Sequence, residues 1–241
     1  MTRLLPVLVA ATAVLATSTP ARADSPIHGA MEFKFGSYFP HVDSEHGLSG
    51  KPYSDVFDDK HILLFQFEWE WQIFQKFGSF AVGISAGYGE VYGHGTTDSD
   101  GSVSDSSTGL KVFPLKALAV YRFDVLARRW NIPLVPFGKL GLVFEPWEVL
   151  NGSGATATSI SDGTTGHGGN WGWEGDLGLA LQLDWFDPHL AKDMDLDLGI
   201  NHAYFFAEIS DMSPIRSNPF HAPNRLRLND TFWNFGLALE Y

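Results

Sequence analysis

A long stretch of alternating side chains does most to limit the folds open to this chain. From Leu63 to Ile73 large apolar residues occupy every second position, and glutamines and glutamates hold most positions between them. Successive side chains of a β-strand point to opposite faces, so the pattern predicts a strand with one apolar and one polar face. A continuous helix would scatter the same glutamates around its whole circumference, so the segment is not predicted to be helical.

The same alternation recurs along the chain. Together with 63–73, the predicted strands are residues 31–36, 80–89, 115–124, 139–145, 173–185, 194–201 and 231–241. Eight strands and no predicted helix place the chain in the all-β class. An extra hairpin arm at residues 155–160 would raise the number to ten, and the sequence leaves that alternative open.

The two faces of these strands differ in size as well as polarity. The apolar faces are dense in Trp, Phe and Leu, and the opposite faces combine small residues with charges. The interior of an eight-stranded barrel is only wide enough to be filled by side chains, and these apolar faces are too bulky for it. In a membrane barrel the large apolar residues face lipid and the small and charged ones fill the lumen. The sequence therefore predicts an eight-stranded antiparallel up-and-down transmembrane β-barrel.

Aromatic residues near the strand ends support this sidedness. Trp173 and Trp185 share one face of a predicted strand with leucines between them. At ~3.3 Å per residue and a tilt of about 40°, the pair spans roughly 30 Å of height, close to an apolar band of about 25 Å edged by aromatic girdles. The predicted girdle residues are Trp69, Trp71, Tyr121, Trp173, Trp185 and Trp233.

The first 23 residues have the order of a secretory signal peptide. Arg3 precedes an apolar run from Leu4 to Leu15, and Ala21-Arg22-Ala23 forms a small-x-small cleavage site. The run is too short to cross a bilayer as a helix, which needs about 20 residues. We expect cleavage near Ala23 and a single barrel domain at residues 24–241.

Charge and cysteine content restrict the partners. The net charge of −12 becomes more negative when Arg3 and Arg22 are removed, which argues against nucleic acid as a partner. The chain has no cysteine, so neither a disulfide framework nor a lipid-anchored cysteine can form. That absence suits a chain that crosses an oxidising periplasm.

The connections alternate between two lengths. Long polar ones are predicted at residues 40–60, 93–109, 147–170 and 210–228, and short ones at 75–79, 125–133 and 186–193. Membrane barrels have long external loops, short periplasmic turns and, for an even strand number, both termini in the periplasm. We therefore expect a Gram-negative outer-membrane protein whose long loops face outward.

The last eight residues resemble the insertion signal that the barrel assembly machinery reads in outer-membrane proteins. Gly236 is followed by alternating apolar residues and the terminal aromatic Tyr241. The segment departs from that signal at Leu239, where a second aromatic residue is common. Tyr241 is predicted to lie in the periplasmic aromatic belt.

The mature chain resembles the small OmpA/OmpX/OmpW-like barrels in architecture. Three segments, 36–43, 121–124 and 201–204 (Gly-Ser-Tyr-Phe-Pro-His-Val-Asp, Tyr-Arg-Phe-Asp and Asn-His-Ala-Tyr), are similar to an uncharacterised family of outer-membrane barrels from myxobacteria and their relatives. The resemblance implies a fold and a location and brings no activity with it.

The lumen is the first candidate site. Its predicted charged residues are Glu32, Lys34, Glu68, Glu70, Lys116, Arg122, Lys139, Glu145, Glu174, Asp176, Asp184, Asp195, Asp197 and Glu240. Charges in a narrow barrel must be paired or hydrated, because isolated burial is very costly. We expect an ion-pair network that plugs the lumen. The acidic excess motivates the alternative of a narrow cation-favouring pore.

Histidines and loop aspartates raise the possibility of a metal site. His41, Asp43, Glu45 and His46 share one predicted loop, and Asp98, Asp100 and Asp105 share another. The aspartates lack the spacing of a calcium loop, and the histidines lack a second compact ligand pair. These residues are interpreted as solvated loop residues, and no metal or cofactor is predicted.

Lipid chemistry is the remaining alternative, since some eight-stranded barrels modify lipid A with a histidine near the outer leaflet. His202 is predicted to face lipid near the outer rim, but Ser210 is roughly 26 Å along the strand, too far for a nucleophile and its base. We predict a non-enzymatic, monomeric barrel that contacts outer-membrane lipids, meets the barrel assembly machinery during biogenesis and binds an unidentified surface partner through its loops.

Overall fold

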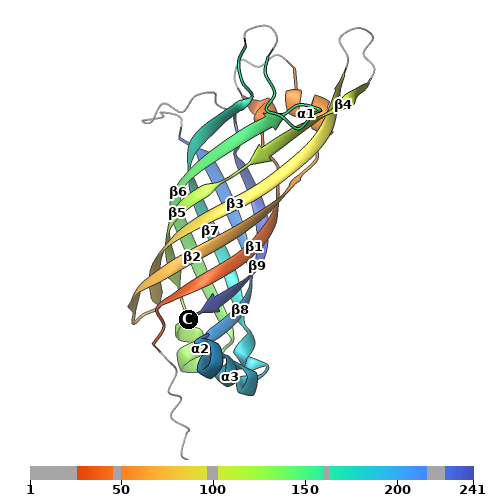
Figure 1. The fold of residues 1–241 in the computed structure, drawn as a ribbon. Coiled ribbons are helices and arrows are strands. Elements are labelled where there is room, and N and C mark those ends of the chain that lie inside the picture. Colours follow the sequence, from red (N-terminus) through yellow and green to blue (C-terminus); the bar gives the residue numbers. More distant parts are fainter. Residues whose placement is uncertain (1–25, 46–49, 97–102, 160–162, 216–225) are drawn as a thin grey trace, which may run out of the picture.

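The computed structural model describes residues 26–45, 50–96, 103–159, 163–215 and 226–241, which form a closed antiparallel barrel (Figure 1). The strands are β1 (Gly29–Tyr38), β2 (Ile62–Gln75), β3 (Ser79–Thr96), β4 (Val103–Val112), β5 (Leu115–Arg122), β6 (Leu134–Leu150), β7 (His167–Gln182), β8 (His202–Pro214) and β9 (Asp230–Glu240). Pairing of β9 with β1 and of β2 with β3 closes the ring. The signal-peptide prediction lies outside the described residues.

Strands β4 and β5 act as one strand of the ring. Both pair with β3 on one side and β6 on the other, and they are separated only by Phe113 and Pro114. The Gly87 amide donates to the Pro114 carbonyl at 2.8 Å and the Phe113 amide to the Pro146 carbonyl at 2.9 Å, so the hydrogen bonding continues across the break. The ring therefore has eight strand positions, which confirms the predicted fold class.

The faces of the strands have the predicted sides. Trp69, Leu179 and Phe235 are exposed on the outer surface, whereas Glu68 and Asp176 are buried inside. An outer surface dense in exposed Phe, Leu and Trp is the surface of a barrel solvated by lipid. The register of β1 with β2 places Glu32 opposite Glu68, so the same parity holds across neighbouring strands.

Helices occur in the connections, which the alternation pattern did not predict. They are η1 (Val42–Ser44) and α1 (Pro52–Phe57) between β1 and β2, α2 (Val125–Trp130) between β5 and β6, and η2 (Leu183–Trp185) and α3 (Pro188–Leu198) between β7 and β8. None of the helices in the described residues has the length and hydropathy of a transmembrane helix.

The predicted strand at 194–201 is wrong. Residues 194–198 belong to α3, and the seventh strand of the ring is β8, which follows it. The connection from β7 to β8 thus covers residues 183–201 and is longer than predicted. Strand β3 extends farther than predicted and β4 precedes the predicted strand 115–124, so the two strands occupy most of the predicted loop 93–109.

The ten-strand alternative finds little support in the described part of the β6–β7 loop. Its only strand-like contacts are the isolated bridges Leu150–Thr156 and Thr158–Thr165. They fold the loop back on itself and add no strand to the ring. The described strand ends that the four predicted long connections join lie at one end of the barrel, which we call the loop end, and the C-terminus lies at the other, the C-terminal end (Figure 1).

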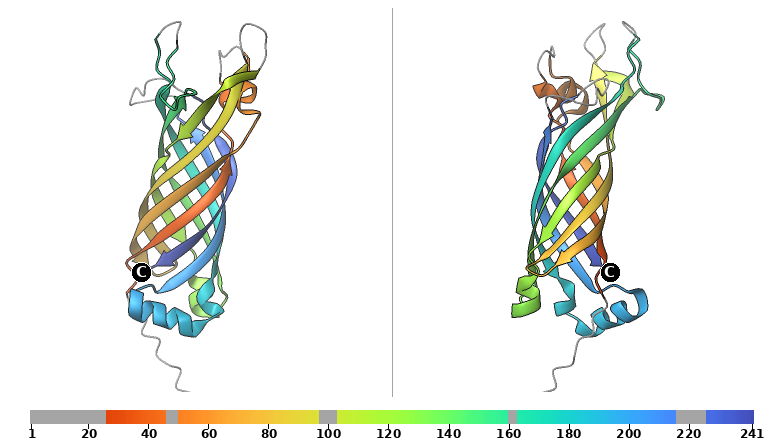
Figure 2. Two further views of the ribbon diagram at one scale, coloured as in Figure 1. Left: turned by 45° about the vertical axis from the view of Figure 1, so that its right-hand side comes forward. Right: turned by 90° about the vertical axis from the view of Figure 1, so that its left-hand side faces the viewer.

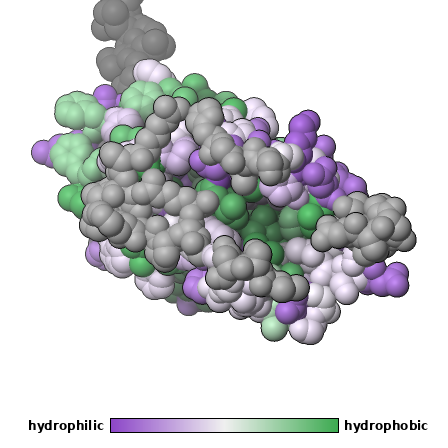
Figure 3. Space-filling view, turned by 90° about the horizontal axis from the view of Figure 1, so that it is seen from above, coloured by the Kyte–Doolittle hydropathy of each residue, from purple (hydrophilic) through white to green (hydrophobic). Residues whose placement is uncertain are grey.

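The barrel interior has three layers along its axis. An apolar cluster that includes Tyr38, Phe57 and Trp147 fills the loop end, and Figure 3 shows hydrophobic surface recessed among the loop residues there. A smaller apolar cluster, with Phe137 and Phe206, lies toward the C-terminal end. Between them lies a layer of charged side chains, which is the unusual feature of this core.

Close packing at Gly236 gives a first prediction. A Cβ added there would lie 2.4 Å from the Phe33 carbonyl oxygen and 2.6 Å from Cζ of Phe206, whereas one added at Gly175 of β7 would meet nothing within 4 Å. We expect Gly236→Ala to lower the free energy of unfolding by about 1–3 kcal/mol because β1 or Phe206 must shift. Gly175→Ala is the matched control and should change it by less than about 0.5 kcal/mol. Urea unfolding of the two refolded variants compares them, and equal losses would contradict the packing argument.

Candidate functional site

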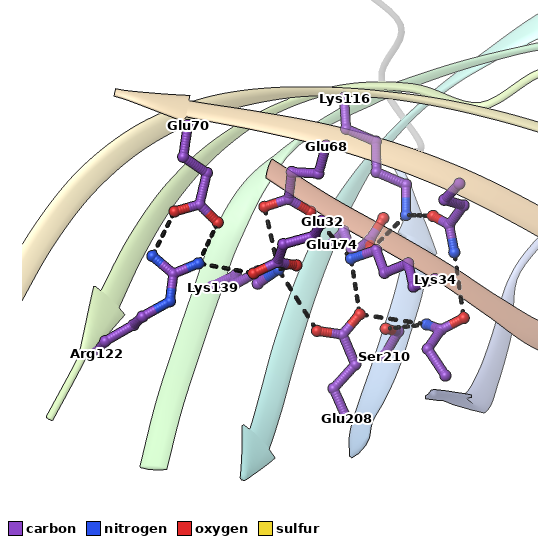
Figure 4. A network of polar contacts seen from close by, with 12 residues as sticks. Glu32, Lys34, Glu68, Glu70, Lys116, Arg122, Lys139, Glu174, Glu208 and Ser210 are labelled. Atoms are coloured by element: carbon purple, nitrogen blue, oxygen red, sulfur yellow. Dashed lines mark hydrogen bonds and ion pairs between the residues drawn. The ribbon is translucent and has the colours of Figure 1, made fainter. Parts of the chain in front are cut away.

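The middle layer of the barrel is built around two lysines that share carboxylates. Lys34 Nζ on β1 lies 3.0 Å from Glu68 and 2.7 Å from Glu208. Lys139 Nζ on β6 lies 3.0 Å from the other Glu68 oxygen, 3.6 Å from Glu208, and pairs with Glu32. Figure 4 shows these side chains converging from different strands on the barrel axis.

Arg122 joins this cluster from β5, on the side of the C-terminal end. Its two terminal nitrogens donate to both oxygens of Glu70 at 2.5 Å, and one of them also donates to Glu32 at 2.6 Å. A bidentate guanidinium–carboxylate pair fixes orientation as well as distance. Glu32 thereby links Arg122 to Lys139 (Figure 4).

Lys116 forms a second branch nearer the loop end. Its ammonium donates to Glu174 at 2.6 Å and to the amide oxygen of Gln66 at 2.5 Å. Gln66 donates in turn to Asn234 at 3.1 Å, and Asn234 donates to Ser210 at 2.8 Å. This branch crosses the barrel from β5 to β8.

Tyrosines continue the polar layer at its two ends. Tyr38 donates to Glu145 at 3.0 Å toward the loop end, and Tyr204 donates to Glu240 at 2.9 Å toward the C-terminal end. Asp176 is buried on β7, opposite Lys139 in the β6–β7 register. All of these carboxylates face the interior.

Carboxylates outnumber cations among the described residues of this layer. The cations are Lys34, Lys116, Arg122 and Lys139, and the carboxylates are Glu32, Glu68, Glu70, Glu145, Glu174, Asp176, Glu208 and Glu240. Oxygens of Glu32, Glu68 and Glu70 lie close enough to one another to surround a metal ion, but these side chains are paired with Lys34, Lys139 and Arg122. The arrangement is therefore an ion-pair network.

Three predicted lumen residues lie elsewhere. Asp195 and Asp197 belong to α3 outside the barrel, because the segment is a helix and not the predicted strand. Asp184 lies in η2 at the C-terminal end, beyond the charged layer. Glu208 was missed for the same reason: with a strand predicted at 194–201 and a loop at 210–228, the part of β8 that carries Glu208 was assigned to neither. The alternation of Tyr204, Phe206 and Glu208 with exposed Phe205 is the signal that identifies that strand.

A polar clasp at the C-terminal end joins η2 to the start of β8. Asp184 Oδ2 lies 2.5 Å from His202 Nδ1 and accepts from the side-chain amide of Gln182 at 2.9 Å. The other carboxylate oxygen, Oδ1, accepts from the backbone amide of Ala203 at 3.1 Å. Burial raises the pKa of Asp184, but the hydrogen bonds from His202, Gln182 and Ala203 outweigh it and hold that pKa below its usual value. A cavity of about 780 Å³ opens beside the clasp, lined in part by α2.

The placement of the clasp overturns the prediction for His202. This residue begins β8 at the C-terminal end, so it is neither at the outer rim nor facing lipid. Ser210 is fully buried inside the barrel and accepts from Asn234. The two residues are not brought together, and this pair offers no nucleophile and base.

The clasp gives a second prediction. Asp184→Asn removes the charge, and hydrogen bonds to a charged group contribute about 1.5–3 kcal/mol, so exchange of the Ala203 amide proton should accelerate about tenfold or more. The folded-state pKa of Asp184 is lowered, so its carboxylate stays charged at neutral pH. The native protein should therefore protect the Ala203 amide proton from exchange at neutral pH and lose that protection as the pH falls below about 4. Hydrogen-exchange mass spectrometry measures both effects. Asp197→Asn, on the exposed face of α3, is the control, and equal acceleration in both variants would contradict the role of Asp184.

The loop residues considered as metal ligands are held by protein groups where they are described. Asp43 accepts from the amides of Tyr53 (2.7 Å) and Ser54 (3.0 Å) and so caps α1. Burial alone would raise the pKa of Asp43, but the hydrogen bonds from Ser54 and Tyr53 outweigh this effect and hold that pKa below its usual value. His41 Nδ1 donates to the Asn229 carbonyl at 2.9 Å. Asp105 is exposed on β4 and Glu45 follows η1, whereas His46, Asp98 and Asp100 lie outside the described residues.

The predicted girdle residues are all exposed, but Trp185 lies in η2, beyond the end of β7, and does not share a strand with Trp173 as predicted. Trp173 and Trp233 lie toward the loop end, and Trp69, Trp71, Tyr121 and Trp185 lie toward the C-terminal end. Near the C-terminus, Gly236 and Leu239 pair with β1, and the Tyr241 ring packs edge-on against Trp69 with centroids 6.0 Å apart. Tyr241 also exchanges backbone hydrogen bonds with Gly29. The role of this segment in insertion stays a prediction.

No protein-family model and no curated protein matches this chain. Among solved structures, it is similar to Ail, the attachment invasion locus protein of Yersinia pestis (12% identity, 90% of this chain and 100% of the other, TM-score 0.45). It is also similar to the N-terminal β-barrel domain of Pseudomonas aeruginosa OprF (12%, 90% and 100%, 0.39) and to Neisserial surface protein A (10%, 90% and 98%, 0.45). The likeness to the myxobacterial barrel family stays a prediction.

Proposed function

We propose that this chain is a monomeric outer-membrane barrel with a closed lumen, which acts as a rigid support for its external loops. Its exposed apolar exterior supports contact with outer-membrane lipids, and its C-terminal segment supports recognition by the barrel assembly machinery. The described parts of the connections at the loop end, residues 39–45, 50–61, 151–159, 163–166 and 226–229, together with the adjoining ends of β3 and β4, are the surface that a partner would meet.

The closed lumen rests on one observation, the solvent exclusion of the charged layer. The side chains of Lys34, Glu68, Lys116, Lys139, Glu174 and Glu208 have no exposed area, and they come from six different strands of the ring. A water-filled passage beside this layer would expose at least some of them. Apolar clusters above and below it add two further barriers.

Planar-bilayer recording tests the closed lumen. The refolded protein, checked for a heat-modifiable shift in gel mobility, should produce no stepwise currents under conditions in which a porin does. Stepwise cation-selective currents would overturn the proposal in favour of a narrow pore, which the excess of carboxylates in the lumen would make cation-selective. An altered acylation pattern of lipid A in expressing cells would instead indicate lipid chemistry.

The cysteine-free sequence allows a direct test of orientation. Ser153 is exposed in the β6–β7 loop and Lys192 is exposed on α3. A membrane-impermeant maleimide added to intact cells should label Ser153→Cys and leave Lys192→Cys unlabelled until the outer membrane is opened. The reverse pattern would place the loops in the periplasm and contradict a surface role.

A further inference from the structure

Helix α3 is a well-defined element outside the barrel wall. The Asp187 side chain accepts from the amides of His189 (3.1 Å) and Leu190 (3.0 Å), and Pro188 occupies the first turn. Gly199 ends the helix in a left-handed conformation with φ of 69°. Figure 2 shows α3 lying crosswise at the C-terminal end of the barrel. A helix capped at both ends and lying across the barrel axis can lie parallel to a membrane surface.

One side of α3 is an apolar stripe that the described residues leave largely uncovered. Leu190, Met194 and Leu198 are spaced by four residues and so lie on one face. Leu190 is 57% exposed and Leu198 is 69% exposed. The adjacent Ala191 is buried against the end of the barrel, so the stripe lies beside the face that packs on η2 and β8.

Exposed aromatic residues mark the level of the membrane surface at this end. Each of the three connections carries at least one: Phe77 in the β2–β3 turn, Trp130 at the end of α2, and Trp185 with Phe186 before α3. Aromatic side chains at the edge of a membrane barrel lie at headgroup level. Trp185 and Phe186 connect the end of β7 to Pro188 at the start of α3, so two exposed aromatic residues lie in the chain between the lipid-facing strand β7 and the stripe.

We propose that α3 is an interfacial helix whose Leu190–Met194–Leu198 stripe is buried in the periplasmic leaflet of the outer membrane. The inference rests on the proposed membrane location and adds a second lipid contact outside the barrel wall. The occupant of the stripe is a phospholipid surface held by apolar contact, because Asp193, Asp195 and Asp197 outnumber Lys192 on the helix and would be repelled by anionic lipid. Binding of α3 should therefore be insensitive to salt.

Two leucines on the same helix provide a matched test. Leu196 and Leu198 are similarly exposed, but two helical residues turn by about 200°, which puts them on opposite sides. Leu198→Cys and Leu196→Cys are each labelled with an environment-sensitive fluorophore and inserted into phosphatidylcholine vesicles with brominated acyl chains. The Leu198 label should be blue-shifted and quenched by the bromines, and the Leu196 label should be quenched by aqueous iodide.

A third labelled position separates failure of this inference from failure of the proposed function. Leu179→Cys, in the middle of the lipid-facing surface of β7, should be quenched by brominated lipid whenever the barrel has inserted. If the Leu179 label is quenched and the Leu198 label behaves like that at Leu196, the interfacial helix is overturned and the barrel proposal survives. A Leu198 label shielded from both quenchers would mean that protein covers the stripe, such as a second copy of the chain, and would also overturn it. Absence of quenching at Leu179 would refute membrane insertion itself.

Discussion

Arg122→Met is expected to lower the free energy of unfolding by about 3–5 kcal/mol, the range for removing one partner of a buried ion pair. Methionine has a similar length but no charge, so the change leaves Glu70 without the guanidinium that binds both its oxygens. Glu32 keeps only Lys139 as its cation. Because both carboxylates are almost fully buried, water cannot replace the lost partner without disturbing the layer.

The matched control is Arg128→Met, the same substitution in a pair whose arginine reaches solvent. Arg128 binds Asp124 at 2.7 Å, and its side chain is 39% exposed although that of Asp124 is only 10% exposed, so water can replace part of the contact and the loss should be clearly smaller than for Arg122→Met. Urea unfolding in phospholipid vesicles compares the two variants. Adding Glu70→Gln to Arg122→Met should recover part of the loss, because the uncompensated charge is then removed. Similar losses in both single variants, or no recovery in the double variant, would contradict the buried network.

The sequence was enough to predict which alternate residues of a strand point into the barrel, because a strand has only two faces. Once Glu68 and Glu70 share a polar face with Gln66 and Gln72, the barrel width decides that this face is inward. The partners of those charges could not be predicted. Pairing of Lys34 with Glu208, or of Arg122 with Glu70, depends on strand stagger around the ring, and alternation within one strand carries no information about stagger.

Helix α3 shows how period two can mislead. Met194, Leu196, Leu198 and Ile200 alternate with aspartates and glycine, yet Leu190, Met194 and Leu198 also fit a helical face. The deciding signals are local: an Asp-Pro start at Asp187 and a Gly stop at Gly199. Because this segment was taken as the seventh strand, residues 202–209 of β8 received no assignment and Glu208 was left out of the predicted lumen, whereas Asp195 and Asp197 were wrongly placed in it.

The short helices α1 and α2 had weaker signals. Helix α1 begins with Pro52 in its first turn, but proline is also common in turns, and the capping residue Asp43 lies outside the helix in the preceding turn. Helix α2 has no side-chain cap and ends at Asn131 in a left-handed conformation. Helices this short are stabilised mainly by packing against the ends of the barrel, and six residues are too few to show a helical period in the sequence.

Leu179→Arg is expected to destabilise the inserted barrel by about 2–4 kcal/mol, the loss found for arginine at the bilayer midplane. Leu179 is exposed on the outside of β7, between the girdle residues Trp173 and Trp185. In water an exposed leucine tolerates arginine with a change of less than about 0.5 kcal/mol, so the size of the effect reports what surrounds the barrel.

Leu196→Arg supplies the control for solvent. This leucine is more exposed than Leu179, but it lies on the side of α3 opposite to the apolar stripe, where we expect water. Unfolding in phospholipid vesicles should therefore separate the two variants by about 2 kcal/mol or more. If Leu179→Arg is as harmless as Leu196→Arg, the Trp- and Leu-bearing exterior is not in contact with lipid, and both the membrane location and the closed-barrel function built on it are wrong.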